Sequence, residues 1–417
     1  MNHFLLSIVF ILSIQNPETG NWPEYRGPSA NGHSAAKGLP LSWSENQNVK
    51  WKVAIHGKGW SSPVVWGDQI WLTTATPDGR EMFVLCIDRN TGKLLLDRKL
   101  FENPEPDPIN DVNSYASPSP VIEEGRVYVH FGSYGTACFD TKTIKPVWIR
   151  RDLPCRHSVG PGSSPVLFRD LLILTMDGID VQYMTALDKR TGKTIWRTDR
   201  GIGASRGTNG GSGTNEGNKS FNTPAFIEFG GKTQMVSTGA KAVVAYDPAT
   251  GSELWRAAHG GYSNSSRPLF GNGMVFINTG YDRAELFAVR LGGSGDVTSS
   301  NVVWKLTKSV PFKPSALLLD GLYYMVTDGG ILTCLEAATG QQVWQERIGG
   351  HFSASPVYAE GRIYLFSEEG KTTVIKPGRK LEVLGENVLS DGFMASAAIA
   401  GKGFYLRTKT HLYRIEE

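Results

Sequence analysis

Residues 186–196 read Ala-Leu-Asp-Lys-Arg-Thr-Gly-Lys-Thr-Ile-Trp, which is typical of a strand, a tight turn and a second strand. Residues 245–255 repeat this pattern, and residues 334–344 repeat it with Glu336 in place of the aspartate. The aspartate carboxylate can accept backbone N–H groups inside the turn, and the glycine can adopt the positive φ that the turn needs. The pattern therefore predicts a β-hairpin that recurs along the chain, and this internal repeat decides the fold.

The tryptophan at the end of each hairpin presents a large flat surface. We expect it to fill the wedge that opens between radially arranged sheets. Two copies depart from the pattern: the copy at residues 86–96 ends in Leu96 instead of tryptophan, and the copy at 138–148 has Ile144 where glycine is expected. The residues predicted to dock one sheet on the next are Asp88, Gly92, Trp148, Asp188, Gly192, Trp196, Asp247, Gly251, Trp255, Trp304, Gly340 and Trp344.

The other half of the repeat begins with Ser-Pro-Val or a looser equivalent. Its eight copies start at Ser62, Ser119, Ser164, Thr223, Arg267, Ser315, Ser355 and Ser396. Their mean spacing of about 48 residues matches the ~40–50 residues of a four-stranded propeller blade. The last copy leaves no room for a fourth strand before Glu417, and residues 48–54 around Trp51 are typical of an outer strand. We therefore predict an all-β, eight-bladed β-propeller of four-stranded antiparallel blades, closed as a ring by that N-terminal strand.

The repeat resembles that of the pyrroloquinoline-quinone (PQQ) enzyme repeat family, a PQQ-like β-propeller family that includes BamB-like and planctomycete-type secreted propellers. The resemblance covers residues from about 43 to 417, and Trp22–Pro28, Tyr134–Asp140 and Arg151–His157 share it. It implies the propeller fold. Because one fold serves many functions, it implies little about activity.

Quinoprotein dehydrogenases of this family carry PQQ and Ca²⁺ in the central channel, under a disulfide between adjacent cysteines and with Glu, Asn and Asp side chains at the site. No two cysteines are adjacent here, and no motif identifies such a set of side chains. Cys86, Cys138 and Cys334 occupy the same position of three repeats, as small buried hydrophobes do, and Cys155 lies in a loop. We expect no cofactor and no metal site, and no catalysis is predicted.

We expect a non-catalytic binding or scaffold module for an unidentified protein, glycan or small ligand. The alternatives are a PQQ- and calcium-dependent dehydrogenase, an enzyme of another class, and a scaffold for outer-membrane protein assembly like the propeller lipoprotein of that machinery. No cysteine follows the N-terminal apolar run, which departs from the lipoprotein.

The net charge is +3 and the basic residues are scattered, so no nucleic-acid partner is expected. The apolar run Phe4–Ile14 is too short to span a bilayer but fits the core of a signal peptide, with a buried N-terminal strand as the alternative. We therefore assign residues 1–20 to a signal peptide and residues 21–417 to a single domain. The mature chain is expected to be a periplasmic or secreted monomer without a transmembrane segment.

Propeller geometry places the loops that enter each innermost strand on one face, together with the loops between the second and third strands. The candidate ligand site on this channel face comprises Trp60, Tyr115, Arg156, His157, Arg206, Asn222, Asn264, His351 and Phe393. Further residues of the same loops are Lys313, Tyr134, Asp177, Asp180, Tyr281, Asp282, Asp328 and Glu368. Two long insertions, Phe101–Ala116 and Asp199–Phe221, precede innermost strands, and we expect both to rim the channel mouth.

Overall fold

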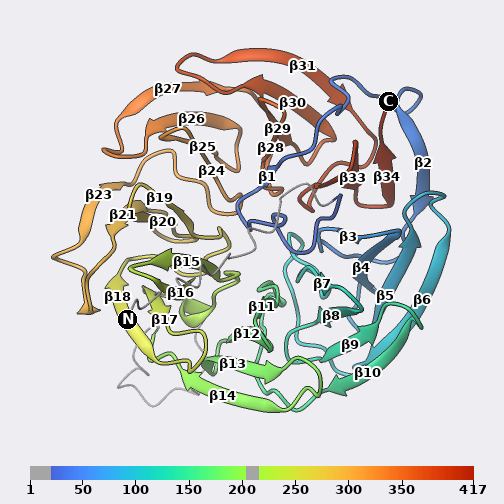
Figure 1. The fold of residues 1–417 in the computed structure, drawn as a ribbon, viewed down its shortest axis with the longest axis horizontal. Helices are drawn as coiled ribbons and strands as arrows, with labels where there is room; N and C mark the ends of the chain where they lie inside the picture. The colour runs from blue at the N-terminus through green and yellow to red at the C-terminus, as the bar shows by residue number, and fades with distance from the viewer. Residues whose placement is uncertain (1–19, 203–215) are drawn as a thin grey trace, which may run out of the picture.

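Eight antiparallel sheets stand around a central axis in the computed structural model, which describes residues 20–202 and 216–417 (Figure 1). Blade 1 consists of β3 (Val64–Trp66), β4 (Gln69–Ala75), β5 (Glu81–Asp88) and β6 (Leu94–Glu102), and blade 2 of β7 (Val121–Glu123), β8 (Arg126–His130), β9 (Thr136–Asp140) and β10 (Lys145–Arg150). Blade 3 consists of β11 (Val166–Phe168), β12 (Leu171–Asp177), β13 (Gln182–Asp188) and β14 (Thr194–Asp199), and blade 4 of β15 (Ala225–Phe229), β16 (Lys232–Thr238), β17 (Ala242–Tyr246) and β18 (Glu253–Ala258).

The second half of the ring repeats this arrangement. Blade 5 consists of β19 (Leu269–Gly271), β20 (Met274–Asn278), β21 (Leu286–Arg290) and β23 (Val302–Leu306), and blade 6 of β24 (Leu317–Leu319), β25 (Leu322–Val326), β26 (Ile331–Glu336) and β27 (Gln342–Arg347). Blade 7 consists of β28 (Val357–Ala359), β29 (Arg362–Phe366), β30 (Lys371–Lys376) and β31 (Glu382–Val388). Blade 8 consists of β32 (Ala398–Ala400), β33 (Gly403–Arg407), β34 (His411–Ile415) and, from the other end of the chain, β2 (Val49–Ala54).

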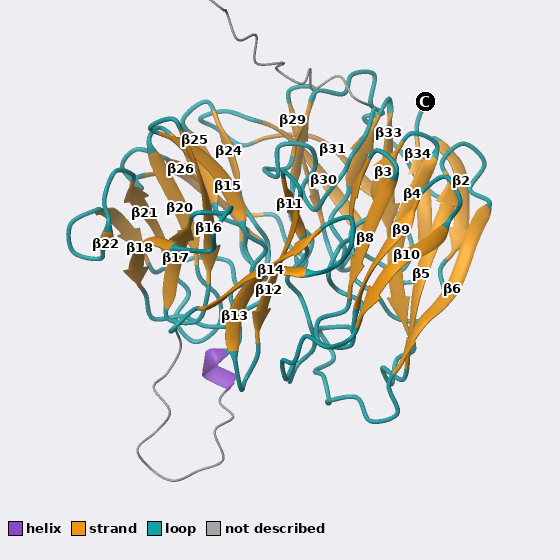
Figure 2. Ribbon diagram, turned by 60° about the horizontal axis from the view of Figure 1, so that its bottom comes forward, coloured by secondary structure: helices purple, strands orange, loops and turns teal. Residues whose placement is uncertain are grey.

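The ring closes as the sequence predicts. Strand β2 pairs antiparallel with β34, with Val53 opposite Leu412, so the first strand of the propeller completes the last blade. Two short strands add to blade edges in parallel: β1 (His33–Ser34) on β28 and β22 (Gly295–Asp296) on β18. A 3-10 turn, η1 (Glu216–Asn218), projects beyond the ends of β12 and β13 (Figure 2).

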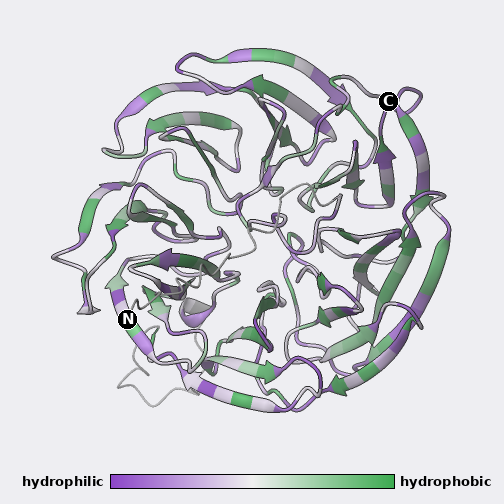
Figure 3. Cartoon of the chain, viewed as in Figure 1, coloured by the Kyte–Doolittle hydropathy of each residue, from purple (hydrophilic) through white to green (hydrophobic). Residues whose placement is uncertain are grey.

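Burial follows the position of a strand within its blade. All residues of β20 and β25, the second strands of blades 5 and 6, are buried, whereas the outer strands β2 and β10 alternate between more and less exposed positions. Figure 3 shows the same contrast, with apolar inner strands and an outer ring that alternates in hydropathy. The inner strands are covered on both faces by neighbouring blades, and their sequences are therefore continuous apolar runs. No helix among the described residues is long and apolar enough to cross a membrane, and the four cysteines are all buried and free.

The terminal tryptophans join successive blades. Trp148 of blade 2 lies against Gly192 of blade 3, where a Cβ atom would come within 2.8 Å of the indole, and its Nε1–H donates to the Lys189 carbonyl at 3.1 Å. Trp196 and Trp304 make the equivalent contacts with Gly251 and Gly340. Within each turn the aspartate carboxylate accepts backbone N–H groups; Asp188 accepts that of Thr191 at 2.8 Å, and Asp88 and Asp247 do the same in their own turns.

The remaining tryptophans make related contacts, in part with residues other than the turn glycine of the next blade. Trp344 donates to the Gly378 carbonyl of blade 7. Trp255 instead lies in register with Gly295 of the added strand β22 and donates to Gln234 of its own blade. Trp51 of the closing strand packs on Gly92 of blade 1, so the last junction of the ring uses the same contact.

The two departures from the hairpin pattern meet at one junction. Leu96 stands at the tryptophan position of blade 1, opposite Cys86, and Ile144 stands at the glycine position of blade 2 with φ 57°. Both side chains are partly buried against the same hydrophobic cluster. Leu96, which is smaller than the usual tryptophan, thus leaves the space that Ile144, which is larger than the usual glycine, needs on the next blade.

We predict that these two positions are energetically coupled. Leu96→Trp alone is expected to destabilise the protein by about 1–3 kcal/mol, because the indole has no room beside Ile144. Adding Ile144→Gly makes room for the indole and removes the strain of the left-handed backbone. The loss of unfolding free energy in the double variant should therefore be about 1–2 kcal/mol smaller than the sum of the losses in the two single variants. Urea unfolding of the four proteins measures the coupling.

The neighbouring junction supplies the reciprocal control. Gly192→Ile should be strongly destabilising in the presence of Trp148 and less so together with Trp148→Leu. Additive free energies at both junctions would contradict the packing described here.

Candidate functional site

A cavity of about 600 Å³ lies at the centre of the ring. Its lining comes mainly from the loops that enter the innermost strands, with two residues from loops between second and third strands. The lining residues are Tyr25, Trp60, Ser62, Asn110, Val112, Asn113, Ser117, Ser119, Val159, Gly162, Ser164, Phe221, Thr223, Tyr262, Ser263, Ser265, Tyr281, Phe312, Lys313, Asp328, Ser353, Met394 and Ser396. Asn110, Val112 and Asn113 belong to the first long insertion and Phe221 to the second, so the described parts of both insertions reach this cavity.

Hydroxyl groups at the blade starts form a chain of hydrogen bonds around the axis. The backbone N–H of Ser62 donates to Ser119 Oγ at 2.8 Å, that of Ser119 to Ser164 Oγ at 2.9 Å, and that of Ser164 to Thr223 Oγ1 at 3.0 Å. A second arc runs from Arg267 N–H through Ser315 and Ser355 to Ser396. Each oxygen in this hydroxyl ring is therefore held in place by the neighbouring blade.

In these hydrogen bonds the hydroxyl oxygens act as acceptors, so their O–H groups can still donate to a ligand in the cavity. Ser119, Ser164, Thr223 and Ser396 line the cavity, and their oxygens accept the neighbouring N–H groups. Within residues 20–202 and 216–417, none of these four hydroxyls donates to a protein acceptor. The ring thus presents an arc of donors from blades 2, 3, 4 and 8.

A buried arginine bridges each gap between the two arcs. Arg267 takes the place of the blade-start hydroxyl in blade 5 and donates from Nε to the Pro224 carbonyl of blade 4 at 2.9 Å. Arg407 of blade 8 donates from Nη1 to the carbonyl and hydroxyl of Ser61 in blade 1. Burial lowers the pKa of Arg407 to about 9, and the guanidinium is held by neutral oxygens.

The segment 22–32 crosses the axis and closes one end of the channel, where Figure 1 shows the dark blue chain at the centre. Trp22 pairs with Val65 of blade 1, and the Pro23 carbonyl accepts the Ile122 N–H of blade 2. On the other side of the ring, Arg26 donates to backbone carbonyls of blades 6 and 7.

Residues of blades 5, 6 and 7 fasten the middle of this segment. Arg267 donates to the Tyr25 carbonyl at 2.6 Å and forms an ion pair with Glu24 at 2.8 Å. The Tyr25 hydroxyl lies 3.0 Å from Ser355 Oγ and 3.4 Å from Ser315 Oγ and lines the cavity. The cavity is therefore a cup, and Tyr25 belongs to its floor.

The charged groups of the cup are paired with one another. Lys313 Nζ lies 3.0 Å from Glu368 Oε1 and 3.6 Å from Asp328 Oδ1. Asp328 also accepts the Phe312 N–H at 2.6 Å, and Ser353 donates to Glu368 at 2.5 Å. Burial by itself would raise the pKa of Glu368, but the hydrogen bonds from Ser353 and Lys313 lower it below its ordinary value. Glu368 is thus charged at neutral pH and paired with Lys313.

The structure places the nine predicted ligand-site residues in different surroundings. Trp60 lines the cavity, together with Lys313, Tyr281 and Asp328 of the wider set. Asn222 and Asn264 are fully buried and hold backbone: Asn222 accepts the Thr238 N–H at 2.9 Å, and Asn264 accepts the Gly280 N–H at 2.7 Å. Arg206 lies outside the described residues.

The other predicted residues lie away from the lining. Tyr115 is buried and donates to the Asp107 carbonyl, and Phe393 is buried against Phe366. Arg156 is exposed and pairs with Asp107 at 3.1 Å, and His351 is exposed with its Nδ1 2.7 Å from Glu369. Sequence reasoning missed Tyr25 and the hydroxyl ring, although the recurrence of serine at the blade starts was a signal for the ring.

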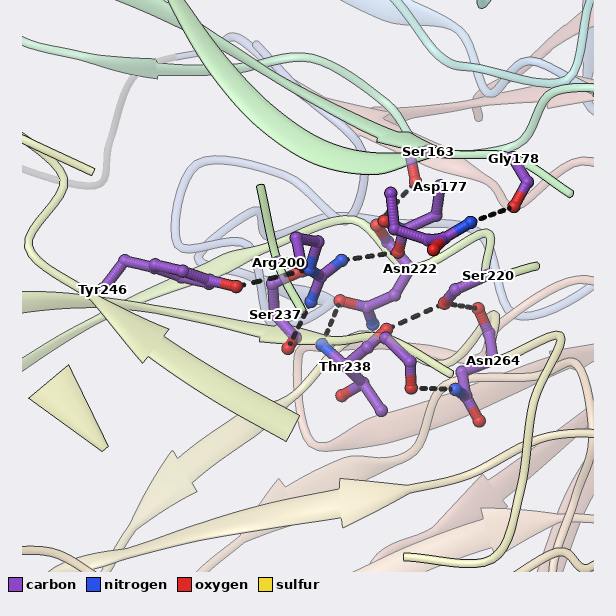
Figure 4. Close-up of polar contacts among 12 residues, drawn as sticks. Ser163, Asp177, Gly178, Arg200, Ser220, Asn222, Ser237, Thr238, Tyr246 and Asn264 are labelled. Carbon is purple, nitrogen blue, oxygen red and sulfur yellow. Dashed lines mark hydrogen bonds and ion pairs between the residues drawn. The ribbon is translucent and has the colours of Figure 1, made fainter. Parts of the chain in front are cut away.

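A buried polar network lies beside the cup (Figure 4). Arg200 and Asp177 are fully buried and ion-paired at 2.5 Å, and Arg200 also donates to the Ser237 carbonyl and to the Tyr246 hydroxyl. Burial raises the pKa of Asp177 to about 6 even though Arg200 acts in the opposite direction. These groups join blades 3 and 4 and do not line the cavity.

Lys219 and His157 form a second buried contact, with Lys219 Nζ 2.5 Å from His157 Nδ1. Burial lowers the pKa of Lys219 to about 8, and burial next to Lys219 holds the pKa of His157 well below its ordinary value. His157 is thus neutral and accepts from the lysine. Neither side chain lines the cup, so the most perturbed titratable groups are separated from it.

Comparisons with known proteins agree with this architecture. A family model described as "Outer membrane protein assembly factor BamB" matches residues 43–214, 180–308 and 293–379. Among solved structures, BamB from Moraxella catarrhalis aligns with a TM-score of 0.60 and 11% identity over 88% of this chain and 99% of that chain. A quinohemoprotein alcohol dehydrogenase from Pseudomonas putida HK5 aligns with a TM-score of 0.64 and 13% identity over 96% and 80%.

A computationally designed protein, Ika8, reaches a TM-score of 0.59 at 12% identity over 91% of this chain and 100% of that chain. At these identities the structural likeness shows the fold alone. No curated protein matches the chain.

The buried lysine predicts a specific dependence of stability on pH. Because the folded-state pKa of Lys219 is about 8 and the ordinary value is 10.5, the unfolded state binds more protons between these values. The free energy of unfolding of the wild type should therefore rise relative to that of Lys219→Met by about 3 kcal/mol from pH 8 to 10.5. Denaturant unfolding at a series of pH values measures this difference. The exposed Lys93→Met serves as the control, and its difference from the wild type should not change with pH in this way. If the difference between the wild type and Lys219→Met were equally independent of pH, the buried charge would be contradicted.

Proposed function

The chain belongs to the family described as outer membrane protein assembly factor BamB, and we propose that it is a non-catalytic binding module that holds a ligand in its central cup. The observation that carries this proposal is the composition of the cup. Its charged lining residues, Lys313 and Asp328, are paired with each other, while uncharged hydroxyl donors and the exposed rings of Tyr281 and Phe312 line the cavity. Such a lining suits recognition by hydrogen bonds and apolar contact.

Acid–base or nucleophilic catalysis needs a titratable group that faces the ligand and is free to move a proton. The groups with strongly perturbed pKa values, His157, Lys219 and Asp177, lie outside the lining and are bonded to other protein groups or buried. The lining of the cup contains no histidine, cysteine or glutamate within the part of the chain described. Binding without conversion is the function that these residues support.

The residues of the cup do not fit PQQ with calcium. Calcium takes six to eight oxygen ligands, usually including several carboxylates. Asp328 is the one carboxylate among the described lining residues, and it is engaged by Lys313 and the Phe312 N–H. PQQ itself carries three carboxylates, and Lys313, the one lining cation among these residues, is already shared by two protein carboxylates. We therefore derive no quinone chemistry for this chain.

The family match favours a second candidate, a scaffold in outer-membrane protein assembly. We also propose that the chain is exported to the periplasm or secreted, because its N-terminal apolar run Phe4–Ile14 fits the core of a signal peptide. A fusion of residues 1–30 to alkaline phosphatase should be active in a bacterial host, and loss of that activity on Leu5→Lys and Val9→Lys is the expected control. An inactive fusion would contradict export.

The binding function is tested by filling the cup. Ligands that raise the melting temperature of the wild type should fail to do so in Met394→Trp, because the new indole occupies the cavity; the stabilisation expected at 100 times Kd is about 2.7 kcal/mol. Val147→Trp, on an exposed outer strand, is the matched control. Mass spectrometry of the recovered ligand should show it unchanged, and its turnover, or equal stabilisation of the filled variant, would overturn the proposal.

A further inference from the structure

We propose that the ligand of the cup is a neutral saccharide, an inference that rests on the proposed binding function and names its ligand class. Three features of the cup lead to it: an exposed aromatic patch from blades 5 and 6, the free hydroxyl donors from other blades, and the absence of an unpaired charge among the described lining residues. Each restricts the chemistry of the ligand in a different way.

The aromatic patch consists of Tyr262, Tyr281 and Phe312, from loops of blades 5 and 6. Their rings form a continuous series, with centroids 5.6 Å apart between Tyr262 and Tyr281 and 6.4 Å apart between Tyr281 and Phe312. Tyr281 is 61% exposed and Phe312 42% exposed, although both line the cavity. An exposed aromatic patch at a cavity marks a binding surface. Aromatic faces carry negative potential, and the C–H groups on the flat face of a pyranose ring complement them.

The free hydroxyl donors come from blades 2, 3, 4 and 8, which do not carry this patch. Ser119, Ser164, Thr223 and Ser396 can donate to a ligand while their oxygens stay fixed by backbone N–H groups. A ligand that meets them must offer several closely spaced oxygen acceptors. A sugar does so along its whole edge while its face remains apolar.

The pairing of the lining charges disfavours the other acceptor-rich ligands, which are anions. Lys313, the one cation among the described lining residues, is shared by two carboxylates, so a phosphate or carboxylate ligand would have to compete with both for it. The same argument disfavours the carboxyl end of a peptide. Residues 22–32 close the other end of the channel, and a terminal carboxylate inside the cup would meet no lining cation that is not already paired. The end of a neutral oligosaccharide brings no such charge.

Binding to a glycan array with neutral α- and β-glucans, mannans, galactans, xylans and chitooligosaccharides, and with uronic-acid and sulfated oligosaccharides, tests the class. At least one neutral oligosaccharide should bind, with the affinity then measured by calorimetry. Tyr281→Ala combined with Phe312→Ala should weaken it at least tenfold, and Thr223→Val, which removes one hydroxyl at equal size, about tenfold. Phe270→Ala, an equally exposed phenylalanine outside the lining, should leave the affinity unchanged.

The inference would be overturned if no neutral glycan on the array binds, or if the anionic glycans bind as well as the neutral ones. Affinity that survives the double aromatic variant would place the sugar elsewhere and overturn it too. Each of these is separable from a failure of the binding function, because the comparison between wild type and Met394→Trp reports on any ligand of the cup. Thermal unfolding of every variant confirms that it is folded.

Discussion

The radial arrangement of the blades sets the requirement that the rest of this structure meets. Eight sheets that converge on one axis leave little room between their inner strands and a widening wedge between their outer strands. Small residues such as Ser119 and Ser164 therefore stand at the axis, and tryptophans such as Trp148 fill the rim. The hydroxyls join neighbouring blades through backbone N–H groups, so the same residues that let the blades converge also give the cup its polar lining.

Departures from the repeat are compensated by partners elsewhere in the chain. Arg267 replaces a blade-start hydroxyl and instead fastens the Tyr25 region across the axis. Blade 7 has Gly385 at the tryptophan position, and there Trp43 of the N-terminal segment packs between Tyr364 and Phe404 of the last two blades. The segment before β2 thus supplies what individual blades lack, and it is part of the propeller as much as the repeats are.

Much of the fold could be predicted from the sequence because it repeats. The eight blade starts, the antiparallel blades and the closing strand are all confirmed, since spacing and turn chemistry are local properties. The pairing of Leu96 with Ile144 was not predicted, because it depends on which residues of adjacent blades face each other. The same limit applies to the site: sequence reasoning places Trp60, Asn222 and Tyr281 in loops of one face, but only the packing shows that Asn222 turns to backbone groups while the other two face the cavity.

The separation between the cup and the buried charges has a physical reason. A charge inside a propeller is costly unless it is paired or hydrogen-bonded, and the long loops between blades 2, 3 and 4 bring polar backbone to the interior that needs partners. Arg200 donates to the Ser237 carbonyl and is paired with Asp177, and Asn222 accepts the Thr238 N–H. The perturbed pKa of Asp177 is therefore a consequence of holding these loops in place. The loops held in this way include Phe221 and Thr223, which form one wall of the cup, so the buried network acts on ligand binding through position and not through chemistry.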